Sequence, residues 1–360
     1  MENERYYVEA PLYHWKALGR ALERGVDGTI DSMVTGDPCI VWEEESQKWL
    51  MYYFAAGNKP GTAGMKIGMA LSRSKTEVGA GDWEKLGEPE YANPEDIWQN
   101  SPHKPWIVMD PYRPNHAAKI DGKYMLFFVS KIGLNCVIQR AWSSSLYGPW
   151  EVQRKPVLRP DTIDGFDSYH TDTVSAYWFE KAGKILLFYK GYPQCEQKDQ
   201  PESPFGSSTA TAVMTPDSET AVKLGEILKP SHDIGHWTSG WTSGIQLLPR
   251  GDGKWLGLTT ASPTPPDSLW NQLYMREPNP SLGGWAFCDE TFPAGQWKTD
   301  ARPIKWIHAL SEDEIRYGER VHLFRHHLLI LQDGTRYLYY NSGPYNNERM
   351  FVHVEEREEA

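Results

Sequence analysis

The amino-acid sequence predicts an all-β fold: a five-bladed β-propeller whose four-stranded antiparallel blades surround a central channel. Three observations lead to this prediction. The chain of 360 residues is rich in aromatic side chains, with 16 Trp, 19 Tyr and 11 Phe, and such residues favour pleated, half-buried surfaces. Five segments spread along the chain each have the pattern of a β-hairpin. Four of these five segments carry a glycine-containing turn suited to a hairpin tip.

The five predicted hairpins share one shape, in which a polar residue precedes a β-rich run, a short polar turn and a second, aromatic β-run. Their sequences are DPCIVWEEESQKWLMYYF from Asp37, NHAAKIDGKYMLFFV from Asn115, DTVSAYWFEKAGKILLFYKG from Asp172, SGIQLLPRGDGKWLGLTT from Ser243 and RHHLLILQDGTRYLYYNSG from Arg325. The last four turn at Asp121-Gly122, Ala182-Gly183, Asp252-Gly253 and Asp333-Gly334. One supersecondary unit that repeats in this way indicates a propeller.

The segments after the first three hairpins predict the outer two strands of each blade. They are MKIGMALSRS and DWEKLG, then CVIQRAWSSSLYGPWEV, then STATAVMTPD and VKLGEIL. Residues 11–25, LYHWKALGRALERGV, suggest a short helical extension. Residues 194–208 are typical of a long surface loop. Because no linker or low-complexity run divides the chain, we expect residues 1–360 to form a single domain.

Composition narrows the classes of function. The formal net charge of −11 argues against nucleic acid, whose affinity for proteins depends on neutralised phosphates, and against an anionic membrane surface. The four cysteines are far apart, so neither a disulfide framework nor a zinc site is expected. The N-terminal residues contain no apolar signal segment, and no run of 18 apolar residues occurs. We therefore expect a cytoplasmic protein, with a secreted chain whose leader has been removed as the alternative.

The residues that lead the hairpins are candidates for a functional site. In a propeller the innermost strands line the channel, so residues near the start of each such strand meet at one mouth. This set is rich in ionisable and aromatic side chains, and charged residues are rarely buried unless they are paired or functional. The alternative is that they make polar contacts between blades. The set is Asp37, Arg113, Asn115, His116, His170, Asp172, Trp241, Ser243, His322 and Arg325.

Four sequence motifs resemble glycoside hydrolase family 43 and its clan relatives. Gly36-Asp37-Pro38 before a β-run resembles the opening blade of that family, and WSSSLYGPWE (142–151) resembles a recurring segment that ends in Gly-Pro-Trp. Phe166-Asp167 with Asp172 and GKILLFYKG (183–191) resembles the third blade, and HLFRHH (322–327) resembles the fifth. The resemblance implies a five-bladed glycosidase in which Asp37 is the general base or nucleophile and Asp172 orients the acid and raises its pKa.

The sequence departs from this family at the general acid. The resemblance places a Glu in the fourth blade, but the corresponding stretch is HWTSGWTSGI (236–245), which contains none. Glu319 is the first candidate for the acid and His236 the second, with His322 also open. In the second blade, the family's usual acidic residue is replaced by Asn115.

Further residues are candidates for sugar binding. Trp241, Trp237 and Tyr169 could form platforms for sugar rings, and Arg113 and Arg325 could bind a carboxylate or a pair of hydroxyl groups. Alternatively, the rings are packing residues and the arginines pair with Asp37 and Asp172. The expected substrate-binding set is Arg113, Asn115, His116, Asp167, His170, Trp241, His322 and Arg325.

Three functions fit this site. The first is an exo-acting, inverting glycosidase that cleaves a short oligosaccharide, a role in polysaccharide degradation, with Asp37 as general base. The second is a glycoside phosphorylase of similar fold, and the third is a non-catalytic carbohydrate-binding propeller. We expect no cofactor and no catalytic metal, although a structural calcium in the channel is compatible with the sequence. The oligomeric state is left open.

Overall fold

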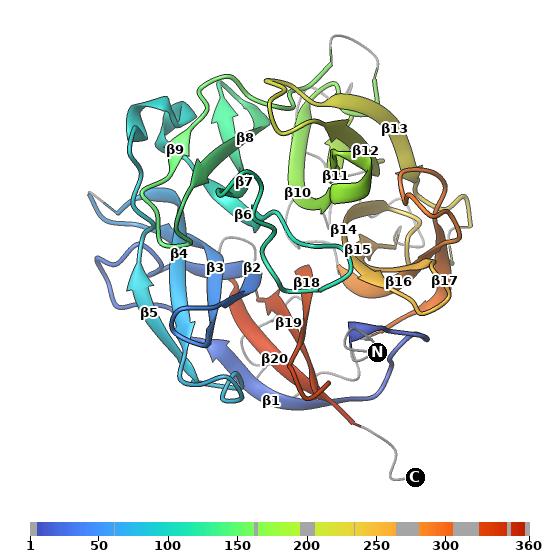
Figure 1. Ribbon diagram of the computed structural model, residues 1–360, viewed down its shortest axis with the longest axis horizontal. Coiled ribbons are helices and arrows are strands. Elements are labelled where there is room, and N and C mark those ends of the chain that lie inside the picture. The colour runs from blue at the N-terminus through green and yellow to red at the C-terminus, as the bar shows by residue number, and fades with distance from the viewer. Residues whose placement is uncertain are drawn as a thin grey trace.

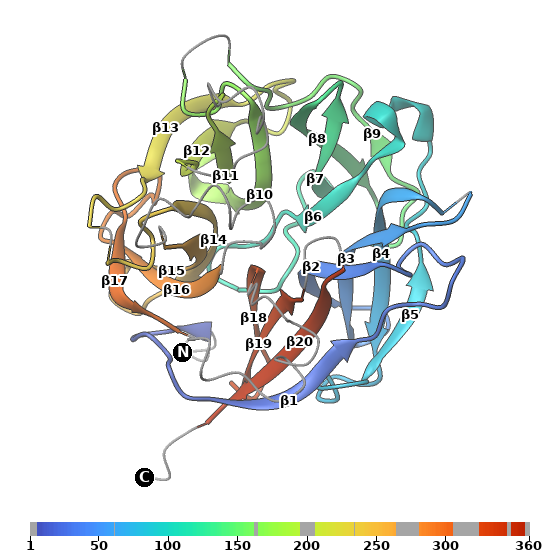
Figure 2. The ribbon, with the colours of Figure 1, turned by 180° about the vertical axis from the view of Figure 1, so that it is seen from behind.

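The computed structural model describes residues 6–60, 62–161, 165–194, 206–233, 235–263, 281–304, 324–343 and 347–356. Its strands form five separate four-stranded antiparallel sheets. The sheets surround one axis, which confirms the predicted five-bladed β-propeller (Figures 1 and 2). Among the described helical segments, none is long and apolar enough to cross a membrane.

Four blades are built from consecutive strands. Blade one holds β2 (Val34–Glu43), β3 (Lys48–Gly57), β4 (Gly64–Ser72) and β5 (Trp83–Gly87). Blade two holds β6 (His103–Ile107), β7 (Tyr124–Ile132), β8 (Asn135–Ser143) and β9 (Glu151–Val152). Blade three holds β10 (His170–Phe179), β11 (Lys184–Tyr192), β12 (Ser208–Met214) and β13 (Val222–Leu228). Blade four holds β14 (Trp241–Pro249), β15 (Trp255–Ser262), β16 (Leu282–Cys288) and β17 (Lys298–Pro303).

Blade five joins the two ends of the described chain. Its inner strands are β18 (Phe324–Ile330), β19 (Arg336–Ser342) and β20 (Arg349–Glu355), and its outer strand is β1 (Trp15–Leu22) from near the N-terminus. The predicted helix over residues 11–25 is therefore wrong. Its Leu, Ala, Lys and Arg content favours a helix, but pairing with the exposed edge of β20 overrides that preference, with a register shift at Gly19, where φ is +109°.

Blade two also differs from the sequence prediction. Its innermost strand is β6 (His103–Ile107), whereas the sequence prediction started the hairpin at Asn115. The segment HKPWI is short and contains a proline, so its strand pattern is weak. Residues 108–123 instead form the connection from β6 to β7, and Asp121-Gly122 turns just before β7. The other three predicted glycine turns join the first and second strands of their blades, as expected.

Each innermost strand contains the same irregularity. A register shift interrupts its pairing with the second strand and skips two residues. The first of these two residues has a left-handed backbone conformation. We call the residue just before it position 0 and the left-handed residue position 1. Such a bulge re-aims side chains at the end of a strand. Position 1 is occupied by Asp37, Lys104, Thr173, Gly244 and Arg325, with φ between +47° and +59°.

A closed ring of hydrogen bonds joins the five blades around the channel. Two residues after the bulge, at position 3, every innermost strand carries a buried side chain that bonds to the backbone of the next blade. The ring runs through Cys39 (from Ile107 N), Trp106 (to Ala176 O), Ser175 (to Ile245 O), Gln246 (to Leu328 O and from Leu328 N) and His327 (from Ile40 N).

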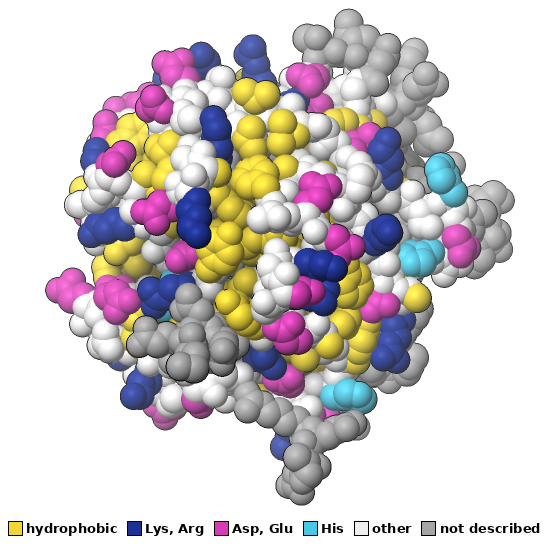
Figure 3. All heavy atoms as spheres, turned by 45° about the vertical axis from the view of Figure 1, so that its right-hand side comes forward, with side chains coloured by type: hydrophobic (Ala, Val, Ile, Leu, Met, Phe, Trp, Pro, Cys, Tyr) yellow, Lys and Arg dark blue, Asp and Glu magenta, His cyan; other side chains and the backbone are white. Residues whose placement is uncertain are grey.

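The hydrophobic core lies between and within the blades rather than on the axis. One large cluster links blades one to four, a second links blades four and five, and a third links blades five and one. On one face of the molecule, acidic and basic side chains are interspersed around hydrophobic side chains nearer the middle (Figure 3). The rigid frame therefore depends on apolar packing between sheets, and the ring of hydrogen bonds sets how the blades meet.

The ring predicts a specific loss of stability. Gln246→Ala removes two hydrogen bonds and leaves the N–H and C=O of Leu328 buried without this partner, so we expect the free energy of unfolding to fall by about 1–3 kcal/mol. Urea unfolding followed by tryptophan fluorescence measures the change. Gln296→Ala, at an exposed loop position, is the control and should change stability by less than about 0.5 kcal/mol. Equal effects of the two substitutions would contradict the ring's role.

Candidate functional site

A cavity of about 150 Å³ lies at the mouth where the innermost strands begin. Side chains at positions 0 and 1 of the blades line it, together with their cross-strand neighbours on the second strands. The lining residues with chemical groups of interest are Asp37, His103, Lys104, Lys131, Cys136, His170, Asp172, Lys190, Tyr192, Trp241, Arg325, Asn341 and Glu348.

The other end of the channel is closed by Asn115. Its side chain donates to the carbonyls of Ile40 and Leu328 and accepts a hydrogen bond from the N–H of Ile330. The connection that carries Asn115 starts in blade two, so these bonds reach blades one and five across the axis. Asn115 is completely buried. It is therefore a structural plug, and the cavity approaches the axis from one side.

The structure brings six of the predicted site residues to this cavity: Asp37, His170, Asp172, Trp241, Ser243 and Arg325. Arg113 and His116 instead line a separate hollow with Tyr112 and Phe179, near the opposite ends of the inner strands. The ring of His116 packs edge-on against Tyr6 and Trp49. These two residues were placed wrongly because the sequence prediction took the segment that starts at Asn115, part of the connection to β7, for the innermost strand of blade two.

The remaining predicted residues either lie away from the cavity or fall outside the described residues. His236 lies in the loop before β14, where its Nδ1 is 2.9 Å from the hydroxyl of Thr238, and it does not line the cavity. Trp237 donates its indole N–H to Asp300 O and is a packing residue. Glu319 and His322 lie outside the described residues. Tyr169 is buried beside His170, with ring centroids 4.0 Å apart.

Asp167, predicted to bind substrate, has a structural role. Its carboxylate is completely buried, 2.6 Å from Lys223 Nζ, and accepts a hydrogen bond of 3.0 Å from Tyr189. Blade one repeats this arrangement: Asp31 lies 2.5 Å from Lys85 Nζ and accepts from Tyr53 at 3.0 Å. In both blades the acid lies five residues before position 0 and links the inner strand to the second and fourth strands. The repetition shows that this triad holds a blade together.

Two ion pairs dominate the floor of the cavity. Lys104 Nζ lies 2.5 Å from Asp172 Oδ2, and Arg325 Nε lies 3.6 Å from Asp37 Oδ2. The backbone N–H of Thr173 donates to Asp172 Oδ1 at 2.7 Å, and the backbone N–H of Asp37 donates to Asn341 Oδ1. Both carboxylates are almost completely buried.

The two acids differ in their pKa. Burial raises the pKa of Asp37, and the nearby charge of Asp172 adds to this, while Arg325 and Lys104 only partly oppose it. Burial acts on Asp172 as well, but the adjacent Lys104 ammonium outweighs it and holds the pKa of Asp172 well below its usual range. Two carboxyl groups whose surroundings push their pKa values apart are typical of sites for acid and base chemistry.

The imidazoles of the cavity are neutral. Burial, assisted by Lys104, lowers the pKa of His103 to about 3, and burial also lowers the pKa of His170 to about 4. His103 Nδ1 lies 2.8 Å from the carbonyl of Ser101 and therefore carries the proton. His170 Nδ1 accepts from the N–H of Cys136, so His170 carries its proton on Nε2.

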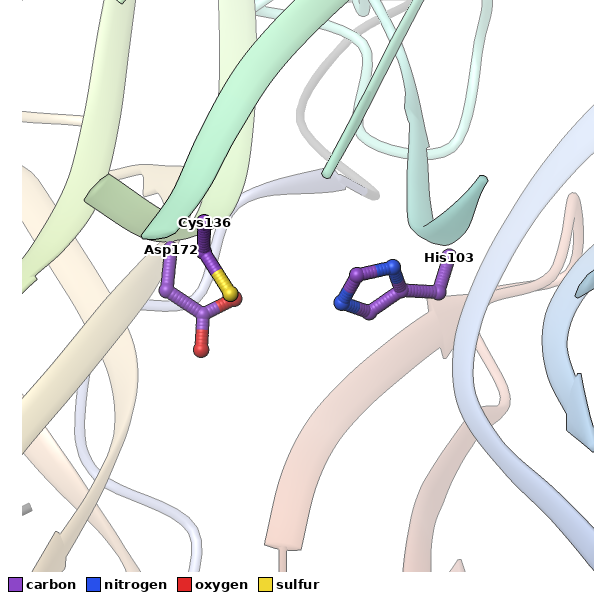
Figure 4. A group of neighbouring side chains, drawn as sticks. All are labelled: His103, Cys136 and Asp172. Atoms are coloured by element: carbon purple, nitrogen blue, oxygen red, sulfur yellow. The ribbon is translucent and has the colours of Figure 1, made fainter. Parts of the chain in front are cut away.

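Three side chains of the cavity could in principle hold a metal ion. The ligand atoms of His103, Cys136 and Asp172 lie within 4.8 Å of one another, and the imidazole of His103 points toward the other two side chains (Figure 4). A sulfur and a nitrogen ligand do not suit calcium, which takes six to eight oxygen atoms. Both oxygens of Asp172 are already engaged, by Lys104 and Thr173. The residues present therefore fit a metal poorly, because Lys104 would repel the cation.

Sequence reasoning missed His103 and Lys104 although a signal was available. Asp37-Pro-Cys-Ile-Val and Lys104-Pro-Trp-Ile-Val match at the proline, isoleucine and valine, which aligns the two inner strands. The second strands gave no such signal. Lys190 reaches the cavity because it pairs across the sheet with Asp172, and Asn341 because it pairs with Phe324.

Comparison with known proteins supports the architecture. No protein-family profile and no curated protein matches the sequence. A structure described as a glycoside hydrolase shares 14% identity at a TM-score of 0.68, over 96% of this chain and 93% of the other. At an identity this low, the comparison shows a common fold.

Two further structures show the same likeness. An endo-arabinase from Bacteroides thetaiotaomicron is 14% identical at a TM-score of 0.57, over 94% of this chain and 99% of the other. Another structure was reported for the GH130 family of mannoside phosphorylases, which contains glycoside hydrolases that target β-1,2 mannosidic linkages in Candida mannan. It is 14% identical at a TM-score of 0.64, over 97% of this chain and 96% of the other.

The buried ion pair predicts a pH-dependent loss of stability. Asp172→Asn leaves Lys104 without its partner, so at pH 7 we expect the free energy of unfolding to fall by about 3 kcal/mol. A carboxylate with a lowered folded pKa stabilises the protein above the unfolded value of about 3.9, and this contribution is lost as the pH falls through the folded pKa. The difference between wild type and variant should therefore shrink in acid.

Urea unfolding of both proteins between pH 3 and pH 7 measures this difference. Asp289→Asn, which removes an exposed surface pair with Lys254, is the control and should change stability by less than about 1 kcal/mol. A difference that stays constant across this range would contradict the assignment of a lowered pKa to Asp172.

Proposed function

We propose that the protein is a glycosidase that removes a sugar from the end of a short oligosaccharide, with Asp37 as general base and with inversion at the anomeric carbon. The observation that carries this proposal is a pair of buried carboxyl groups with opposite pKa shifts in one cavity. The structural neighbours described as a glycoside hydrolase and as an endo-arabinase support a reaction on a glycosidic bond.

The chemistry of Asp37 suits a base. A carboxylate whose pKa is raised by burial is a stronger base than one in water, and a general base works best when its pKa approaches the working pH. Arg325 and Lys104 limit the rise and so keep the group ionisable. Asp172, held ionised by Lys104, contributes a fixed negative charge that raises the pKa of Asp37 further.

The general acid in this proposal is Glu348. Inverting hydrolysis needs a second group that protonates the leaving oxygen, on the opposite side of the bond from the base and its water. Apart from Asp37 and Asp172, the described lining of the cavity contains one more carboxyl, that of Glu348, at the edge of blade five. His236 lies elsewhere, and Glu319 lies outside the described residues.

The plugged channel is the support for exo-action. Asn115 and the connection between β6 and β7 cross the axis below the cavity. A cavity closed at its floor accommodates the end of a chain more readily than its middle.

A second function, phosphorolysis, is favoured by a specific observation. Lys104, Lys131, Lys190 and Arg325 all line the cavity, and a phosphorylase needs cations to hold the phosphate that replaces water. Incubation of substrate with and without inorganic phosphate, followed by analysis for sugar-1-phosphate, separates the two reactions.

Asp37→Asn tests the catalytic assignment. The amide cannot accept the proton of water, so we expect kcat to fall by about 10²–10⁴-fold while the affinity for the oligosaccharide changes little. Turnover of a panel of short oligosaccharides, with NMR of the product anomer, measures the first effect, and calorimetry measures the second. Asp27→Asn, at an exposed loop position, is the control. Unchanged turnover in Asp37→Asn would overturn the role of Asp37. If the wild-type protein cleaved no glycoside, the function that still fits would be the non-catalytic carbohydrate-binding propeller.

The ion pair with Arg325 predicts the acidic limb of the pH–rate profile. A general base must be ionised, so kcat should decline as the pH falls through the raised pKa of Asp37. Arg325→Gln removes a cation that lowers this pKa, and the limb should move to higher pH. Arg154→Gln, from a surface pair with Asp96, should leave the limb in place. A shift toward lower pH in Arg325→Gln would contradict the assignment.

A further inference from the structure

The basic side chains of the cavity are unequally paired. Of the four that line it, Lys104 is paired with Asp172 and Arg325 with Asp37. Among the described residues, no carboxylate oxygen lies within 4.0 Å of the Nζ of Lys131 or Lys190. Two lysines in the same cavity thus have no carboxylate within ion-pairing distance in the described part of the protein, although Asp172 acts electrostatically on Lys190.

Lys190 is the more demanding of the two. It lies on β11 and is only 3% exposed, and its Nζ is 3.8 Å from the ring centroid of Trp241 and 4.4 Å from that of Tyr192. Burial lowers its pKa well below the ordinary value. Aromatic faces stabilise an ammonium group, but by less than the cost of burying its charge without a carboxylate within ion-pairing distance. An anion in the cavity would make up the difference.

The lysines converge on one side of the cavity. Lys104, Lys131 and Lys190 each act electrostatically on His170, whose pKa they lower in addition to the effect of burial. Asp172 is the carboxyl on this side that faces them, and it opposes them at His170. Asp37 and Glu348 come from blades one and five. We call Lys104, Lys131, Lys190 and His170 the lysine wall, to which His170 contributes the N–H of Nε2.

We propose that the lysine wall binds an oxyanion, the carboxylate of a uronic acid unit in the substrate, and that Lys190 is the main determinant of this specificity. The inference rests on the proposed action on oligosaccharides and adds the substrate class. Inorganic phosphate offers the same oxygen chemistry and is the other source of such an anion. The wall disfavours a metal at His103, Cys136 and Asp172 for the same reason that it favours an anion.

Calorimetric titration of the full chain tests the proposal with matched ligands. Galacturonate is compared with galactose, glucuronate with glucose, and inorganic phosphate is titrated alone. We expect at least one uronate, or phosphate, to bind at least tenfold more tightly than the neutral sugars. Lys190→Met, which keeps the length of the side chain and removes its charge, should reduce this preference at least tenfold.

Two further variants complete the design. Lys119→Met removes an exposed lysine that also lies over an aromatic ring, 5.1 Å from the centroid of Tyr124, outside the cavity, and should leave the preference intact. Lys131→Gln repeats the test on the wall if Lys190→Met does not fold, as judged by thermal unfolding, and should also weaken binding of the anion.

The outcomes separate this inference from the proposed function. Preference for a uronate supports a carboxylate ligand, and preference for phosphate, with phosphate-dependent cleavage, assigns the same wall to a phosphate co-substrate. Equal binding of acidic and neutral sugars, without binding of phosphate, would overturn the inference and leave the glycosidase proposal standing. Binding of no sugar and no phosphate would overturn both.

Discussion

The closed ring of side-chain to backbone hydrogen bonds around the channel is the interaction on which the rest of the structure depends. Each blade contributes one buried side chain with a hydrogen-bonding group at position 3 of its inner strand, and each side chain bonds to the next blade until His327 returns to blade one. Since apolar packing between sheets has little directional preference, these bonds fix how far the blades are rotated around the axis. They also satisfy backbone groups that would otherwise be buried without partners.

The cavity forms next to the ring, two residues earlier on each inner strand. Just before position 3 every inner strand bulges, and the left-handed residue at position 1 redirects the chain at the cavity mouth. A non-glycine residue in this conformation is uncommon, yet four of the five blades place Asp37, Lys104, Thr173 and Arg325 there. The strain is tolerated because the paired strands and the ring hold the backbone on both sides. Three of these residues, Asp37, Lys104 and Arg325, form the charged floor of the cavity with Asp172 from position 0.

The sequence allowed the fold to be predicted because its signals are local. Alternating apolar residues and glycine turns such as Asp333-Gly334 identify hairpins without knowledge of their neighbours. The prediction went wrong at β1 and β6, where the strand exists because of its partner: β1 closes the edge of β20, and β6 is short and interrupted by Pro105. The error at β6 then displaced Arg113 and His116 from the expected site. Asp37, Asp172, His170, Trp241 and Arg325 were found because they lie on inner strands that were identified correctly.

Other parts of the site could not be predicted from the sequence. Lys190 and Asn341 lie on second strands, and their position depends on register across the sheet, which a single strand does not reveal. The structural role of Asp167 becomes visible only beside its counterpart Asp31. The pKa difference between Asp37 and Asp172 likewise depends on distances to Arg325 and Lys104 that the chain order does not encode.

A crystal structure of Asp37→Asn with a short acidic oligosaccharide tests the central claim most directly. The account predicts that the terminal sugar occupies the cavity between the amide substituted for Asp37 and the carboxyl of Glu348, with its own carboxylate against Lys190 and Lys131. A sugar bound instead in the hollow of Tyr112 and Arg113, at the opposite ends of the inner strands, would contradict it.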